Sequence, residues 1–184
     1  MPAAQTRVRI MAAARQLFCQ AGFDQVGVRE LAAAASVDPA VVIRLFGSKE
    51  ALFAAVAADA FVLEPPFDGP LEGLGQQMAH YLTGKIEICD TPGGFDSFRF
   101  LLRSAASPVA APILSASLHA GFIDPLARHL GGREAGARAA LLSACVLGFA
   151  TLRVALTSPA LEEAMPDQVA QRLGAVLQAC LDSI

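Results

Sequence analysis

Basic side chains in the first fifty residues are the groups of this sequence best suited to chemistry. This segment holds six, Arg7, Arg9, Arg15, Arg29, Arg44 and Lys49, against four acidic residues, a balance of +2, whereas the remainder holds 8 basic and 13 acidic residues, a balance of −5. Guanidinium and ammonium groups bind phosphates, and a guanidinium also hydrogen-bonds the edge of guanine. The uneven charge is compatible with nucleic-acid binding confined to one end of the chain.

An enzyme is the first alternative, and the sequence gives it little support. Gly73-Leu74-Gly75 is a fragment of a glycine loop with no strand pattern before it, and no Gly-x-Ser-x-Gly, His-Glu-x-x-His or P-loop motif is present. The four cysteines, Cys19, Cys89, Cys145 and Cys180, are widely spaced and have no histidine at metal-ligand spacing. We therefore expect no enzymatic activity, no cofactor and no metal.

The sequence is expected to contain neither a signal peptide nor a membrane-spanning segment. The N-terminus lacks the basic and then apolar layout of a signal peptide. The most apolar stretch, residues 139–152, is too short to span a bilayer before Arg153 interrupts it. We expect a cytoplasmic protein with reduced thiols and no membrane partner.

The composition favours a helical fold that positions these groups. Hydrophobic residues make up 54% of the 184 residues, alanine and leucine dominate, and β-branched runs are short. Helical periodicity predicts an all-α chain of about nine helices. They are expected near residues 6–21, 28–35, 39–46, 48–63, 71–90, 94–106, 109–130, 133–157 and 166–184, separated by segments rich in proline and glycine.

The ends of the first helices are the ones that local residues predict most clearly. Gly22 supplies the left-handed residue that ends many helices. Asp38 is placed to cap a helix that has Pro39 at its first position, where a missing N–H costs nothing. Ser48 is placed to cap the next helix. A small core is expected beneath them, from Ala13, Leu17, Phe18, Phe23, Leu31, Val37 and Phe46.

Two short helices joined by a tight turn and preceded by a supporting helix have the layout of a helix-turn-helix. The residues carry the pattern further: Ile10-Met-Ala-Ala-Ala-Arg-Gln-Leu-Phe18, Ala21-Gly-Phe23, Val28-Arg-Glu-Leu-Ala32, Ala35-Ser-Val37 and Phe46-Gly-Ser-Lys-Glu-Ala-Leu52. In this order they closely resemble the DNA-binding domain of the tetracycline-repressor (TetR) family, over residues 7–56 without a gap.

The resemblance implies a division of the chain and a set of DNA contacts. Residues 1–50 would form a three-helix, helix-turn-helix DNA-binding head, and residues 51–184 a helical effector-binding and dimerisation domain. Arg29 and Lys49 are placed to meet phosphates, while Ala40, Val41 and Arg44 would face the groove. The sequence departs from the family pattern at Gly27, Ser36, Ile43 and Leu45, where members usually carry Thr or Ser, Gly, Tyr and His.

The resemblance implies a homodimer that senses a small molecule. Apolar residues recur at helical spacing in the last two long helices, and the expected interface is Leu141, Cys145, Phe149, Leu152, Leu173 and Leu177. Candidate pocket residues are Met78, Tyr81, Phe98, Arg99, Leu102, Leu118, His119 and Phe122. Their mainly apolar character favours an apolar effector.

The function predicted from these features is a transcriptional regulator. It would be a repressor released from a palindromic, double-stranded DNA operator by a small apolar ligand, with the fourth helix transmitting the change. The alternative is a helical dimeric interaction protein with a degenerate DNA-binding head, which Ile43 and Leu45 favour. Sequence-specific DNA binding distinguishes the two.

Overall fold

The computed structural model describes residues 3–62, 69–84 and 96–182, and within these residues the chain forms helices and no strand. The all-α prediction is therefore confirmed. The chain divides into two compact units, the first from residues 1–61 and 89–118, the second from residues 62–88 and 119–184. The loops predicted at 65–66 and 91–93, and the parts of the predicted helices that fall in 63, 85–90, 94–95 and 183–184, lie outside the described residues.

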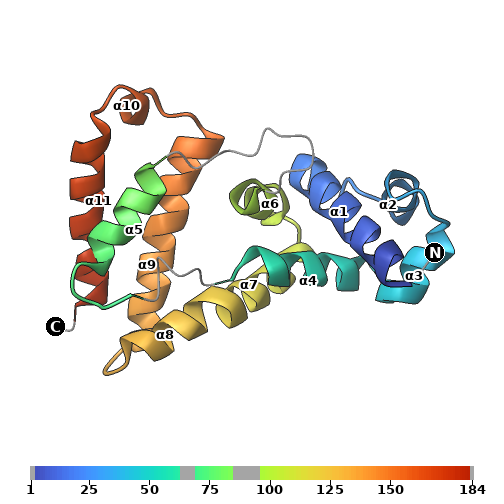
Figure 1. The fold of residues 1–184 in the computed structure, drawn as a ribbon, viewed down its shortest axis with the longest axis horizontal. Helices are drawn as coiled ribbons and strands as arrows, with labels where there is room; N and C mark the ends of the chain where they lie inside the picture. Colours follow the sequence, from blue (N-terminus) through green and yellow to red (C-terminus); the bar gives the residue numbers. More distant parts are fainter. Residues whose placement is uncertain (1–2, 63–68, 85–95, 183–184) are drawn as a thin grey trace. The chain divides into compact units, whose positions relative to one another are not determined.

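The first unit contains the predicted helix-turn-helix and the helices that support it. Its elements are α1 (Ala3–Ala21), α2 (Val28–Ala34), α3 (Pro39–Phe46), α4 (Lys49–Ala60), α6 (Ser97–Ser104) and α7 (Ala110–Leu118) (Figure 1). Helix α1 packs against α2, α4 and α6, and α7 packs against α4. Helices α6 and α7 therefore join the same unit as the DNA-binding motif, although they are distant from it in sequence.

Aromatic rings fill the centre of the first unit. The Phe53 ring contacts those of Phe18 and Phe23 edge to face, with both centroid separations at 5.0 Å, and the tilted Phe100 ring at 4.8 Å. All four side chains are buried. Phe100 comes from α6, so the core that fixes the helix-turn-helix is completed by a residue from the second half of the sequence. Leu17, Val37 and Phe46, predicted as core, are half-buried and pack against its edge.

The second unit is built on three long helices. Its elements are α5 (Leu74–Thr83), α8 (Asp124–Leu130), α9 (Ala135–Ala150), α10 (Pro159–Glu162) and α11 (Pro166–Leu181), with π-helical turns at His119–Ile123 and Thr151–Ala155. Figure 1 shows α5 alongside α11, and α11 also packs against α9. The short α10 and both π-helical turns were not predicted from the sequence.

Helix α9 is unusually apolar for its exposure. Among the described residues one helical run, Ala135–Arg153, is long and apolar enough to cross a membrane, and 28% of its most apolar window is buried. This run is longer than the 139–152 stretch considered in the sequence. Arg153 at its end donates hydrogen bonds to the carbonyl oxygens of Leu82 and Gly84 within the second unit. Much of the apolar surface of α9 is therefore not covered by the rest of the second unit.

Candidate nucleic-acid interface

Helix α3 is held at both ends by local interactions. At its start the Asp38 carboxylate accepts a hydrogen bond from the Ala40 N–H at 2.7 Å, and Pro39 occupies the first turn, as predicted. At its end the Arg7 guanidinium donates to the Leu45 carbonyl oxygen at 3.1 Å and lies 4.3 Å from the centroid of the Phe46 ring. A cation at the C-terminus of a helix is electrostatically favourable. Arg7 therefore positions α3 as well as adding charge.

Exposed residues on α3 form one continuous face. Ala40 and Arg44 are exposed, and Ile43 between them is 43% exposed. Ile43 and Arg44 follow Ala40 by three and four positions, so both lie on the same side of the helix as Ala40. Val41 is half-buried and lines a hollow of about 280 Å³ together with Arg44 and the first turn of α1. Ile43 is not among the predicted groove residues, although its spacing from Ala40 places it on this face.

The remaining predicted contacts lie at the starts of α2 and α4. Arg29 is exposed in the first turn of α2, whose N-terminus is capped by the Glu30 carboxylate accepting from the Gly27 N–H at 2.7 Å. Lys49 begins α4 directly after Ser48, whose hydroxyl accepts from the Ala51 N–H at 3.1 Å. Gly27 has no side chain that could cap α2. The Glu30 carboxylate instead accepts the hydrogen bond of the Gly27 N–H.

Lys49 also has a role inside the protein. Its ammonium donates to the Phe23 carbonyl oxygen at 3.0 Å and lies 3.9 Å from the centroid of the Phe23 ring. These contacts hold the start of α4 against the end of α1. An ammonium has three donors, so the same group can bind a phosphate while keeping its bond to Phe23.

The turn between α2 and α3 contains a residue in a left-handed conformation. Ser36 has a φ of +52°, which side chains other than glycine adopt at a cost. This explains the family preference for glycine at this position. We predict that Ser36→Gly raises the free energy of unfolding by about 0.5 kcal/mol or slightly more, as measured by urea denaturation. Ala33→Gly, an exposed position in α2, should instead lower it by about 1 kcal/mol, and equal effects of the two variants would contradict the argument.

A second contact region ties α6 and α7 to the end of α1. The buried Ser104 hydroxyl accepts from the Phe23 N–H at 3.1 Å, and the Ser107 hydroxyl donates to the Asp24 carboxylate at 2.9 Å. Gly22 ends α1 with a φ of +79°, as predicted, and a Cβ there would lie 2.5 Å from the Arg103 carbonyl oxygen. These bonds join the corner before α2 to the end of α6 and to the turn between α6 and α7.

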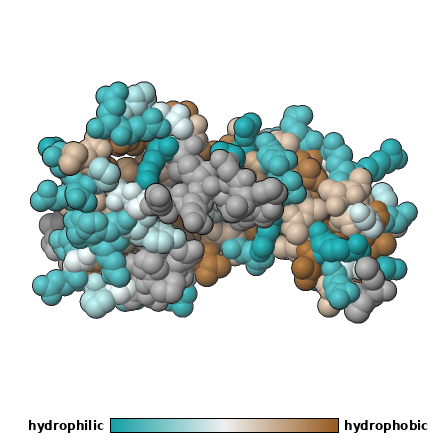
Figure 2. Space-filling model, turned by 45° about the horizontal axis from the view of Figure 1, so that its top comes forward, coloured by the Kyte–Doolittle hydropathy of each residue, from teal (hydrophilic) through white to brown (hydrophobic). Residues whose placement is uncertain are grey.

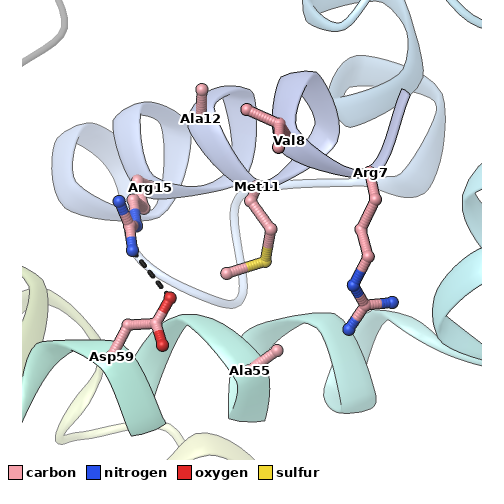
Figure 3. Close-up of a pocket in the computed structure, with 7 residues that line it drawn as sticks. All are labelled: Arg7, Val8, Met11, Ala12, Arg15, Ala55 and Asp59. Carbon is pink, nitrogen blue, oxygen red and sulfur yellow. Dashed lines mark hydrogen bonds and ion pairs between the residues drawn. The ribbon is translucent and has the colours of Figure 1, made fainter. Parts of the chain in front are cut away.

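An open hollow of about 430 Å³ lies between α1 and α4 (Figure 3). Met11 and Ala55 lie between the two helices, and Arg15 forms an ion pair with Asp59 at 2.7 Å across one end. The remaining lining residues are Arg7, Val8 and Ala12. An exposed ion pair of this kind stabilises a protein by less than about 1 kcal/mol. Helix α4 is therefore joined to α1 only lightly along this edge.

The predicted pocket residues are divided equally between the two units. Phe98, Arg99, Leu102 and Leu118 lie in the first unit, and Met78, Tyr81, His119 and Phe122 lie in the second. Met78 is fully buried, Tyr81 and Leu102 are partly exposed, and the His119 imidazole lies 3.6 Å from the Asp124 carboxylate. Among the residues that the structure describes, no three histidine, cysteine or acidic side chains come together as a metal site.

The predicted pairing residues lie along α9 and α11 in the second unit. Leu141 is 60% exposed and Leu152 is 47% exposed, whereas Cys145, Phe149 and Leu173 are half-buried. Leu177 is fully buried within its own protomer. Leu156 and Val176, which are also exposed, add to the apolar surface. In the space-filling view of Figure 2, exposed hydrophobic residues also interrupt the hydrophilic surface around α1–α3.

Comparison with known proteins matches both parts of the chain to one family. Residues 10–56 match the family described as "Bacterial regulatory proteins, tetR family", and residues 72–181 match "Tetracyclin repressor-like, C-terminal domain". The chain has no significant match among curated protein sequences.

Solved structures show the same architecture. A TetR-family regulator from Streptomyces coelicolor A3 is 26% identical, with a TM-score of 0.60 and coverage of 98% of this chain and 97% of that one. NalD of Pseudomonas aeruginosa is 20% identical, with a TM-score of 0.64 and 96% coverage of both chains. SmeT in complex with triclosan is 22% identical, with a TM-score of 0.64 and coverage of 95% and 90%.

The two sequence matches cover the helix-turn-helix and most of the remaining helices, and the fold agrees with them. This combination supports a DNA-binding transcription regulator. The chain belongs to the TetR family of bacterial regulatory proteins.

Proposed function

We propose that this protein is a cytoplasmic, dimeric repressor that binds a palindromic DNA operator through α3 and leaves it when a small apolar ligand binds. Residues 1–50 act as the DNA-binding domain, and residues 51–184 sense the ligand and pair the protomers. No catalytic reaction is assigned to the chain. The observation that carries the proposal is the exposed face of α3, where Arg44 stands beside Ala40 and Ile43 on a helix fixed at both ends.

The chemistry of this face suits a mixed base contact. The Arg44 guanidinium can hydrogen-bond a guanine edge, and Ala40, Val41 and Ile43 can contact thymine methyl groups. Arg29 and Lys49 flank this face at the starts of neighbouring helices, where they can bind phosphates and fix the register of α3. Base contacts from α3 would then give the sequence preference, and the flanking cations would give affinity that falls with salt.

The Arg44 contact is tested with the purified full-length protein. Genomic fragments that it binds are selected and sequenced, and the affinity of the enriched sequence is measured by anisotropy over a range of salt concentrations. We predict that Arg44→Ala weakens binding by about 10- to 100-fold. A guanine contact would relax specificity and leave the salt slope unchanged, whereas a phosphate contact would reduce the slope by about one.

The matched control is Arg133→Ala, which removes the same charge from an exposed turn in the second unit. It should bind the operator as the wild type does. If no palindrome is enriched, or if both variants bind equally well, the DNA-reading proposal is wrong. A stable dimer that enriches no sequence would support the interaction protein with a degenerate head, which the exposed Ile43 favours.

Pairing through α9 and α11 accounts for the exposed apolar surface of the second unit. Leu141, Leu152 and Val176 are each about half exposed or more. A two-fold axis would also match the symmetry of a palindrome. Leu177 would support this surface from within the protomer core.

The pairing surface is tested by Leu141→Glu, which places a charge where little burial within the protomer is lost. We predict that it raises the dimer dissociation constant at least 30-fold, measured by analytical ultracentrifugation, because an unpaired charge would be desolvated. Ala140→Glu changes a neighbouring exposed residue of α9 and serves as the comparison. Dimers of unchanged affinity in Leu141→Glu would place the interface elsewhere.

The sensing mechanism rests on the edge of α4 that is joined to α1 by the exposed Arg15–Asp59 ion pair. A ligand that moves α4 would change the position of the attached α3, and the hollow beside Met11 leaves room for such a shift. The names of two similar structures, a secondary repressor of an efflux pump and a triclosan complex, support repression and an apolar ligand. Apolar compounds that raise the melting temperature should weaken operator binding. Stabilising compounds that leave operator binding unchanged would contradict this part of the proposal.

A further inference from the structure

Cys145 and Cys180 come together where α9 packs against α11 in the second unit. Arg138, Leu142 and Cys145 are four and three residues apart and therefore share one face of α9. The Arg138 guanidinium donates to the carbonyl oxygens of Cys180 and Leu181, and Leu142 is fully buried. This face of α9 is therefore directed at the C-terminal turn of α11, which contains Cys180.

The two thiols lie close enough to interact, because the Cys145 thiol raises the pKa of the Cys180 thiol. Both residues are half-buried free cysteines. Cys19 differs from them, because it is buried in the first unit and its thiol donates to the Asp96 carbonyl oxygen at 3.6 Å. Cys145 and Cys180 thus have the partner and the partial exposure that disulfide formation requires, and Cys19 has a backbone partner instead.

We propose that Cys145 and Cys180 are a disulfide-forming pair that peroxides oxidise within one protomer. A thiolate attacks the peroxide, an S–O bond forms as the O–O bond breaks, and the product is a sulfenic acid. The second thiol then attacks this sulfur, an S–S bond forms as the S–O bond breaks, and water leaves. In total two thiols lose two hydrogen atoms and hydrogen peroxide is reduced to two water molecules.

Burial and the neighbouring Cys145 raise the pKa of the Cys180 thiol, so Cys180 ionises less readily than a free cysteine. Thiolates, and not thiols, attack peroxide and sulfenic acid, so each cysteine reacts through its ionised form.

The bond would join the two helices that carry the proposed pairing surface. A covalent link between α9 and α11 fixes the spacing of Leu141 and Val176, which lie on different helices. The bond forms within a single chain, so its formation requires neither DNA binding nor pairing.

The experiment uses the full-length, reduced protein treated with hydrogen peroxide. Remaining thiols are alkylated, and the protein is digested with trypsin without reduction and examined by mass spectrometry. Trypsin places Cys145 in peptide 139–153, Cys180 in peptide 173–184 and Cys19 in peptide 16–29. We expect the first two peptides to be joined, two hydrogen masses below their sum, while the Cys19 peptide is alkylated. Two of the four thiols should be lost.

Serine variants identify the partners. Cys145→Ser and Cys180→Ser should each abolish the joined peptide, and Cys19→Ser, the matched control, should leave it unchanged. Non-reducing electrophoresis should show a monomer band, which establishes that the bond lies within one chain. The proposal is overturned if peroxide leaves the pair reduced, converts it to sulfinic acid without a link, or joins either cysteine to Cys89, Cys19 or a second copy.

Discussion

Replacing Phe53 with alanine is expected to lower the free energy of unfolding by about 4 kcal/mol. The Phe53 ring is fully buried and contacts three other rings, with centroid separations of 5.0, 5.0 and 4.8 Å. These partners come from α1, the turn after it and α6, so no single helix can move inward to fill the space. The cavity would therefore remain, and the lost burial and the lost ring contacts would both destabilise the first unit.

Urea denaturation followed by circular dichroism measures this loss. Val8→Ala provides a control, because Val8 is 67% exposed on α1 and its truncation should change stability by less than about 0.5 kcal/mol. Operator binding by Phe53→Ala should fall in step with the folded fraction as temperature rises. A stability loss below about 1.5 kcal/mol would show that the aromatic cluster does not hold the first unit together.

Local signals made the DNA-binding half predictable from sequence. Gly22, Asp38 and Ser48 each act within three or four residues of themselves, through a left-handed turn or a capped N–H. Such signals are readable because the partner is adjacent in the chain. The groove face of α3 follows from the same periodicity, which also places Ile43 on it.

The contacts that hold this half in place were not predictable in the same way. Phe100 and Ser104 come from α6, roughly fifty to eighty residues from Phe53 and Phe23, and nothing near them in sequence specifies that partner. The Lys49 ammonium also had a hidden partner, the Phe23 carbonyl oxygen, 26 positions away in sequence. Pairings of this kind depend on the packed fold, so sequence gave the charge of Lys49 but not its internal bond.

In the second unit, the sequence did not predict where regular α-helix is interrupted. Periodicity predicted one helix over 109–130 and another over 133–157, but π-helical turns occur at 119–123 and 151–155. A π-helical turn contains one extra residue, which rotates the side chains of the following turns about the helix axis. The spacing of apolar residues in the sequence does not reveal this extra residue. Likewise Leu177 and Leu141 both fit the apolar stripe, yet one is fully buried and the other is 60% exposed.

The crossing of α5 and α11 gives the second large expected effect. Gly75→Ala should lower the free energy of unfolding by about 3 kcal/mol. A Cβ on Gly75 would lie 2.4 Å from the Gln178 backbone nitrogen and 2.6 Å from the Gly174 carbonyl oxygen, and these backbone atoms cannot rotate away. The helices would have to separate, which would also break the bond from the Gly75 N–H to the Gln178 side chain.

The sign of this effect distinguishes packing from helix propensity. Alanine is favoured over glycine inside a helix by about 1 kcal/mol, so propensity alone predicts that Gly75→Ala is stabilising. Gly136→Ala is the matched control, since this glycine lies in α9 with no atom within 4 Å of an added Cβ, and it should be neutral or slightly stabilising. Thermal and urea denaturation of both variants provide the comparison. If Gly75→Ala is as stable as the wild type, α5 and α11 are not in close contact at Gly75 and Gly174.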